Sequence, residues 1–214
     1  MNFQILIAYT SMLSVLVPLI PGLILWKWQQ GNLKLILWLV ISSVISDLLS
    51  LWLMNRRINT WPVINLFLLV QFSFLFQILG DQRKIILLRI LFFACIGFGL
   101  YNFLFLQTPK ALNSYTSYAA AILMIISALS FLYQLMNEIP VEKIQTLPLF
   151  WLAFGVLVYY GGNLFLFLFN NYLIAHLPKS HQTIWVLHNL LNITKNVFFF
   201  VTLWINYKSR TSRP

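Results

Sequence analysis

A chain of 214 residues in which 60% of the side chains are hydrophobic and only 8% are charged lies outside the composition of soluble globular domains. The 14 Lys and Arg exceed the 4 Asp and Glu, giving a net charge of +10, but the basic residues lie in short clusters between apolar runs. This pattern favours anionic lipid headgroups over nucleic acid as their partner. The single cysteine, Cys95, excludes an intrachain disulfide and a cysteine-based metal motif.

Seven apolar stretches are long enough to cross a bilayer, which requires about 20 mainly apolar residues. In chain order they cover approximately 3–26, 33–54, 61–79, 85–106, 115–136, 149–169 and 184–206. The first is expected to remain in the protein, because it is too long for the core of a cleavable signal. The sequence therefore predicts an all-α membrane protein, a single bundle of seven transmembrane helices over residues 1–214.

Basic residues are unevenly divided between the two ends of the predicted bundle. The end with the C-terminus has Lys27, Lys34, Arg83, Lys84, Arg89, Lys143, Lys208, Arg210 and Arg213, and the opposite end has Arg56, Arg57, Lys110 and Lys179. Because cytoplasmic loops are enriched in Lys and Arg, this bias predicts an N-terminus outside and a C-terminus in the cytoplasm. We expect a bacterial cytoplasmic (inner) membrane, with anionic headgroups at the cytoplasmic face and a further membrane protein as a candidate partner.

Three local patterns predict irregularities in the helices. Pro18 and Pro21 should kink the cytoplasmic third of the first span, because a proline removes a backbone donor and crowds the preceding turn. Gly161-Gly162 predicts a close helix approach in the sixth span. The Asn170-Asn171 pair is expected to end that span.

The last span is the polar one. His188, Asn192 and Lys195 fall at i, i+4 and i+7 and so form one stripe on the helix. A lysine near the middle of a span costs about 3 kcal/mol or more unless it meets a carboxylate, lines water or snorkels. Asp47 is the only carboxylate within any predicted span, and counting residues puts it level with Asn192. We therefore expect Asp47 and Lys195 to be paired inside the bundle.

Other polar residues are expected at a similar depth in the outer half of the bundle. The predicted pocket consists of Ser43, Asp47, Asn163, His188, Asn192 and Lys195. In this interpretation Asp47 balances Lys195, the asparagines bind a small polar ligand or a lipid headgroup, and His188 lies at the mouth. The alternative is a structural membrane subunit in which these side chains only fix helix packing.

A metal site is a second hypothesis. The three histidines, His176, His181 and His188, all fall near the outer end of the last two spans. Neutral imidazoles together with a carboxylate are suitable zinc ligands, so Asp47 is the fourth candidate. No other cofactor is expected.

Two spacings resemble the seven-helix alkaline ceramidase and adiponectin-receptor superfamily. The chain has Ser43-x3-Asp47 on the second span and His188-x3-Asn192 on the seventh. The family has Ser-x3-His on helix two, an Asp on helix three and His-x3-His on helix seven. Ser43 and His188 match that pattern, whereas Asp47 and Asn192 stand at two of its histidine positions. The resemblance implies an intramembrane zinc-dependent lipid hydrolase as the alternative function.

Two further hypotheses start from Lys195. A central lysine on the last of seven helices resembles retinal-binding rhodopsins, with Asp47 as the counter-ion. Asp47, His188 and Lys195 at stepped depths also suggest proton or solute handling, although no acidic group continues the path through the inner half. The sequence has no phosphate loop or nucleophile elbow, so we expect a binding protein, similar to small bacterial membrane proteins that bind a ligand or serve as subunits, rather than an enzyme.

Overall fold

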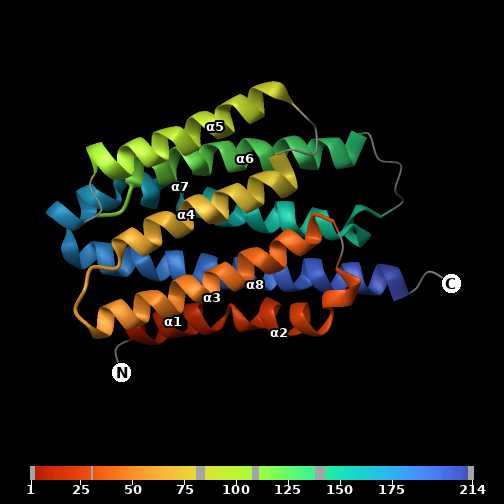
Figure 1. Ribbon diagram of the computed structural model, residues 1–214, viewed down its shortest axis with the longest axis horizontal. Helices are drawn as coiled ribbons and strands as arrows, with labels where there is room; N and C mark the ends of the chain where they lie inside the picture. The colour runs from red at the N-terminus through yellow and green to blue at the C-terminus, as the bar shows by residue number, and fades with distance from the viewer. Residues whose placement is uncertain (1–2, 30, 81–84, 108–110, 138–142, 212–214) are drawn as a thin grey trace.

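The computed structural model of the chain describes residues 3–29, 31–80, 85–107, 111–137 and 143–211, with the backbone alone for 178–182 and 210. Most of the described residues are helical, and none of them lies in a strand. Seven helical stretches of the described residues are long and apolar enough to cross a membrane, which confirms the predicted all-α class and the predicted number of candidate spans. Because that number is odd, the first helix begins at one end of the bundle and the last helix finishes at the other (Figure 1). We call these the N-terminal end and the C-terminal end.

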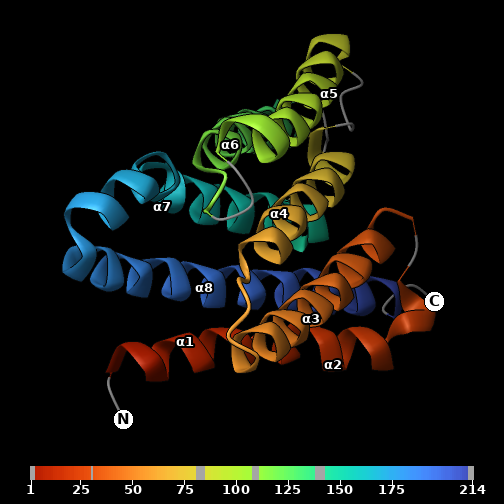
Figure 2. The same ribbon diagram turned by 60° about the vertical axis from the view of Figure 1, so that its left-hand side comes forward.

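The spans correspond to the helices as follows. The first comprises α1 (Phe3–Leu13) and α2 (Leu16–Ile24), the second is α3 (Leu33–Asn55), and the third is α4 (Trp61–Leu75) continued by a π-helical turn (Phe76–Gly80). The fourth is α5 (Ile86–Tyr101) with a π-helical turn (Asn102–Leu106), the fifth is α6 (Ser114–Asn137), the sixth is α7 (Pro148–His176), and the seventh is α8 (Pro178–Thr211). Helix α8 lies between α7 on one side and α1 and α2 on the other (Figure 2).

The first span is interrupted between α1 and α2, at Ser14 and Val15. Pro18 has no N–H to donate to the carbonyl of Ser14, and the Val17 N–H bonds that carbonyl instead at 3.1 Å. The interruption therefore lies near the middle of the span, one turn before Pro18, and not in the third where the sequence predicted the kink. The Ser14 hydroxyl accepts a hydrogen bond from Asn196 Nδ2 at 2.8 Å, which ties this point to α8.

The sixth span does not end at Asn170-Asn171 as predicted, because α7 continues to His176 over 29 residues. Asn170 Oδ1 accepts a hydrogen bond from Trp185 Nε1 at 3.1 Å, and Asn171 Nδ2 donates to the Leu112 carbonyl at 3.1 Å. Asparagine interrupts a helix when its side chain competes for nearby backbone groups. Here the two amides bond other segments, so the helix continues.

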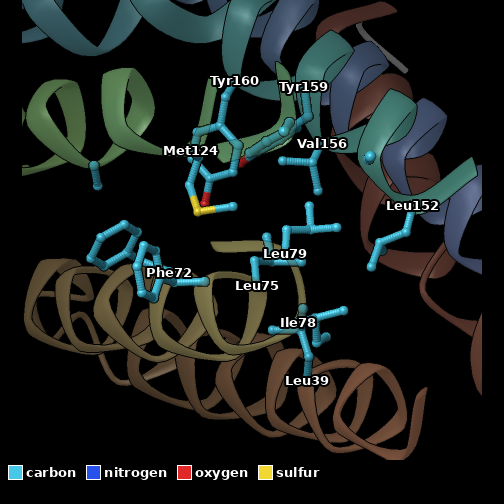
Figure 3. Close-up of a cluster of buried hydrophobic side chains, with 14 of the residues drawn as sticks. Leu39, Phe72, Leu75, Ile78, Leu79, Met124, Leu152, Val156, Tyr159 and Tyr160 are labelled. Carbon is cyan, nitrogen blue, oxygen red and sulfur yellow. The ribbon is translucent and has the colours of Figure 1, made fainter. Parts of the chain in front are cut away.

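Much of the hydrophobic core lies in the half of the bundle toward the C-terminal end. It gathers buried side chains from α3, α4, α6 and α7, among them Leu39, Phe72, Leu75, Ile78, Leu79, Met124, Leu152, Val156, Tyr159 and Tyr160 (Figure 3). Most of these residues come from the first part of α3 and α7, from the last part of α4 and from its π-helical turn, which are the parts nearest the C-terminal end. The half toward the N-terminal end contains a cavity.

Glycines allow α7 and α8 to approach closely. A Cβ atom on Gly162 would lie 2.6 Å from Leu191 Cδ1, in line with the approach predicted for Gly161-Gly162, whereas a Cβ on Gly161 would meet nothing within 4 Å. The tightest point is Gly155, where a Cβ would lie 2.5 Å from Phe198 Cβ. Gly155 thus sets the distance at which α8 packs on α7.

We expect Gly155→Ala to lower the free energy of unfolding by about 1 to 3 kcal/mol, because the added methyl group forces the two helices apart. Gly161→Ala is the matched control, and we expect it to raise stability by up to about 1 kcal/mol, because alanine is the better helix former and the site is open. Unfolding in mixed micelles measures both. Equal effects of the two substitutions would contradict a close contact at Gly155.

Candidate functional site

A cavity of about 370 Å³ lies between α1, α3, α4, α7 and α8, in the half toward the N-terminal end. Its volume falls within the range of small-molecule sites, about 300 to 1,000 Å³. The polar residues that line it are Ser11, Ser43, Ser46, Asp47, Ser50, Gln71, Tyr159, His188, Asn189, Asn192 and Lys195. Trp61, Phe67, Leu68, Leu112, Phe167 and Trp185 supply apolar wall. Such a concentration of polar groups is unusual in a membrane interior and makes this cavity the candidate site.

The structure brings five of the six predicted pocket residues to the cavity wall. Ser43 and Asp47 reach it from α3, and His188, Asn192 and Lys195 reach it from α8. Asn163 does not line the cavity; it lies behind His188, buried on α7. That these residues bind a ligand stays a prediction.

Lys195 is buried, with 4% of its surface exposed. Its ammonium donates a hydrogen bond to Gln71 Oε1 at 2.9 Å and lies 4.5 Å from the centre of the Tyr159 ring, within cation–π range. Gln71 Nε2 in turn donates to the Tyr160 hydroxyl at 3.2 Å, which turns the amide oxygen toward the lysine. The sequence predicted an interior partner for Lys195. In the structure this partner is the side-chain amide of Gln71 on α4 together with the ring face of Tyr159 on α7.

The direct pair of Asp47 with Lys195 expected from the sequence is not formed, since no ion pair joins them in the described part of the chain. Asp47 lies where the cavity meets α1, whereas Lys195 lies at the deep end, where the adjoining space is lined by Val40, Gln71 and Phe199. Gln71 is the nearer acceptor because it faces Lys195 at that depth. The two opposite charges interact only electrostatically across the cavity.

His188 is oriented by Asn163. The Asn163 amide Nδ2 donates to the Tyr159 carbonyl at 2.8 Å, so its Oδ1 must accept the contact with His188 Nδ1 at 2.9 Å. The proton of the neutral imidazole therefore lies on Nδ1, and Nε2 is the acceptor that His188 can offer to the cavity. The ring packs against Trp185, with centroids 4.5 Å apart.

We expect Asn163→Leu to abolish this fixed tautomer. Nitrogen NMR of protein labelled at histidine should show protonated Nδ1 at His188 in the wild type and a mixture of both tautomers in the variant, because the acceptor of the Nδ1 proton is lost. His176, which is exposed at the end of α7, provides the internal reference. An unchanged His188 signal would show that Asn163 does not orient the ring.

Two asparagines of α8 bond the first span and the segment that follows it. Asn192 Nδ2 donates to the Ser11 hydroxyl at 3.0 Å, which leaves the Asn192 carbonyl oxygen as the group it can offer to the cavity. Near the C-terminal end, Asn206 Nδ2 donates to Gln29 Oε1 at 2.7 Å. These contacts give Asn192 and Asn206 a structural role. The sequence alone does not show which polar residues of α8 are structural and which could bind a ligand.

The candidate zinc ligands are only partly brought together. His188 and Asp47 both line the cavity, but His176 lies outside it, at the end of α7, where its ring stacks on Tyr172 with centroids 4.4 Å apart. The side chain of His181 lies outside the described residues. Among the residues described, no group of three or more His, Cys, Asp or Glu side chains could hold a metal ion. A catalytic zinc requires three protein ligands, so the described donor set does not fit one.

The cavity does not continue through the bundle. Beneath Lys195, the space among Val15, Leu39, Val40 and Phe199 leaves no room for a water molecule. Beyond it lies the hydrophobic core (Figure 3). The site is a blind pocket in this conformation.

Comparisons of the chain with protein-family models, with curated proteins and with solved structures give no match. The function of the protein is therefore inferred from the residues that line the cavity.

Proposed function

We propose that the protein is a membrane-embedded binding protein whose cavity holds a small zwitterionic ligand, one that carries an ammonium group and an acidic group. The supporting observation is that Asp47 and Lys195 line one cavity and have no direct ion pair between them. An uncompensated charge within a membrane costs several kcal/mol. A ligand that carries both charges removes both costs at once, with its ammonium at Asp47 and its acidic group at Lys195.

The remaining cavity groups complement such a ligand. Ser43, Ser46 and Ser50 lie on the cavity face of α3 with Asp47 and supply hydroxyl groups around the ammonium. His188 Nε2 accepts a hydrogen bond from a ligand hydroxyl or ammonium group. The floor beneath Lys195 is filled, so the protein holds its ligand and does not conduct it.

The orientation and location are part of the proposal. The excess of Lys and Arg at the C-terminal end favours a cytoplasmic C-terminus, which opens the cavity toward the outer face of a bacterial cytoplasmic membrane. Anionic headgroups then meet the basic residues at the cytoplasmic face. A receptor with only short loops has little surface for an output, so a signal would pass to a partner membrane protein.

The second candidate is an intramembrane metal-dependent lipid hydrolase. One observation favours it: a metal-bound histidine commonly donates its other ring N–H to an oxygen, as His188 Nδ1 does to Asn163. The ligand set would then need His181 in addition to His188 and Asp47.

Native mass spectrometry of gently solubilised protein, with metal analysis of the same sample, separates the two. The binding proposal expects one organic zwitterion per chain and no stoichiometric metal. A stoichiometric zinc ion that is lost in His188→Ala would contradict it and support the hydrolase. A protein that carries no ligand and co-purifies with a second chain would also contradict it and indicate a structural subunit.

A further inference from the structure

A second cavity, of about 400 Å³, lies between α1 and α3 and adjoins the polar one. The two share Ala8, Met12, Asp47 and Ser50, so these four residues form the junction. The remaining wall is mostly apolar and includes Ile5, Tyr9, Leu51 and Met54. We call this second cavity the α1–α3 groove.

The groove faces the outside of the bundle. Ile5 and Tyr9 on one side are each 49% exposed, and Met54 on the other is 54% exposed. Helix α1 packs on α8, whereas α3 packs on α2 and α4, so the two helices that flank the groove are held by different neighbours (Figure 2). At the depth of the membrane, an exposed apolar groove between two spans opens into the acyl chains of the bilayer.

We infer that the ligand is a single-chain zwitterionic amphiphile taken from the bilayer, with its polar head in the cavity and its hydrocarbon chain in the α1–α3 groove. This inference rests on the proposed function. A water-soluble ligand would gain no affinity from an apolar groove that ends at Asp47. In the described part of the protein, one such groove adjoins the polar cavity. The groove can therefore hold one hydrocarbon chain of the ligand.

The order of the charges further restricts the ligand. Asp47 belongs to the junction, next to the groove, and Lys195 lies at the deep end of the cavity. A ligand that enters through the groove therefore has its ammonium close to the chain and its acidic group farther from it. A long-chain amino phosphate has this order, whereas a lysophospholipid with an ethanolamine headgroup has the reverse order.

Three probes test this by native mass spectrometry titration: sphinganine 1-phosphate, lysophosphatidylethanolamine, and free phosphoethanolamine, which has the charges without a chain. We expect one sphinganine 1-phosphate per chain, bound at least 10-fold more tightly than lysophosphatidylethanolamine and at least 100-fold more tightly than phosphoethanolamine. Lysophosphatidylethanolamine that binds as tightly as sphinganine 1-phosphate would overturn the inferred order of charges.

Ala8→Phe fills the junction with a bulky side chain, and Ala94→Phe is the matched control on the exposed surface of α5. We expect Ala8→Phe to weaken binding of sphinganine 1-phosphate at least 10-fold more than it weakens binding of phosphoethanolamine, because the groove holds only the hydrocarbon chain. An unchanged far-UV circular dichroism spectrum reports that the variant is folded. Ala94→Phe should bind all probes like the wild type. If Ala8→Phe has no effect and the chain adds no affinity, the groove is not the entry path and the proposed function stands.

The variants Asp47→Asn and Lys195→Met test the proposed function separately from the role of the groove. Both variants should lose affinity for the amphiphile and for the free headgroup. If neither variant changes the binding of any probe, the two charges do not hold the ligand, and both proposals fail. Absence of binding by all three probes likewise overturns both.

Discussion

Gln71→Leu is expected to lower the free energy of unfolding by about 3 kcal/mol, although leucine normally suits a membrane span better than glutamine. Gln71 Oε1 accepts the hydrogen bond of the Lys195 ammonium at 2.9 Å, and Lys195 is 4% exposed. Leucine leaves the ammonium buried without this acceptor, and the cost of burying a charge then falls on the folded state. Unfolding by sodium dodecyl sulfate in mixed micelles measures the difference.

Gln77→Leu is the matched control, because Gln77 is an exposed glutamine on the same span. We expect a change within about 0.5 kcal/mol there. Adding Lys195→Met to Gln71→Leu should restore most of the lost stability, since an apolar pair of similar volume can replace a buried polar pair at little cost. If Gln71→Leu behaves like Gln77→Leu, the contact between Gln71 and Lys195 does not stabilise the protein.

Asp47→Asn and Lys195→Met are each expected to lower ligand affinity about 100-fold, because each leaves one charge of a bound zwitterion without its partner. Both residues line the cavity, and no direct ion pair joins them in the described structure, so each can contact a ligand group of opposite charge. Retention of the co-purified ligand through dilution, followed by native mass spectrometry, measures the loss.

Lys208→Met is the control for the lysine, because Lys208 lies exposed on the same helix near the C-terminal end. Its ligand occupancy should equal that of the wild type. A structural role for the cluster makes a different prediction: Asp47→Asn and Lys195→Met would alter stability and leave occupancy unchanged. That result would remove the basis for a binding site.

The number and approximate position of the spans follow from the sequence because the bilayer imposes a length of about 20 apolar residues on each helix. Helix ends that depend on tertiary contacts do not follow. Asn170 and Asn171 suggest a helix end until Trp185 and Leu112 are placed beside them. The interruption at Ser14 is also difficult to place from the sequence. A proline leaves the carbonyl four residues before it without its usual donor, so the helix is interrupted about one turn before the proline itself.

The polar stripe of α8 was predictable because helical periodicity places His188, Asn192 and Lys195 on one face. The partner of Lys195 was not. Counting residues gives depth along the membrane but not which neighbouring helix faces the lysine, so the count could not decide between Asp47 and Gln71. The only signal for Gln71 is an amide near the middle of an apolar span, a group that seldom faces lipid. Asp47 was predicted as the partner because it carries the charge opposite to that of Lys195.

An experimental map of the protein purified with its native lipids in nanodiscs tests the central claim most directly. We expect density for a single ligand between Asp47 and Lys195, with a chain that leaves the cavity between α1 and α3, while the Lys195 ammonium keeps its hydrogen bond to Gln71. A closed cavity in which the Asp47 carboxylate contacts the Lys195 ammonium directly would contradict the account, because the two charges would then compensate each other without a ligand.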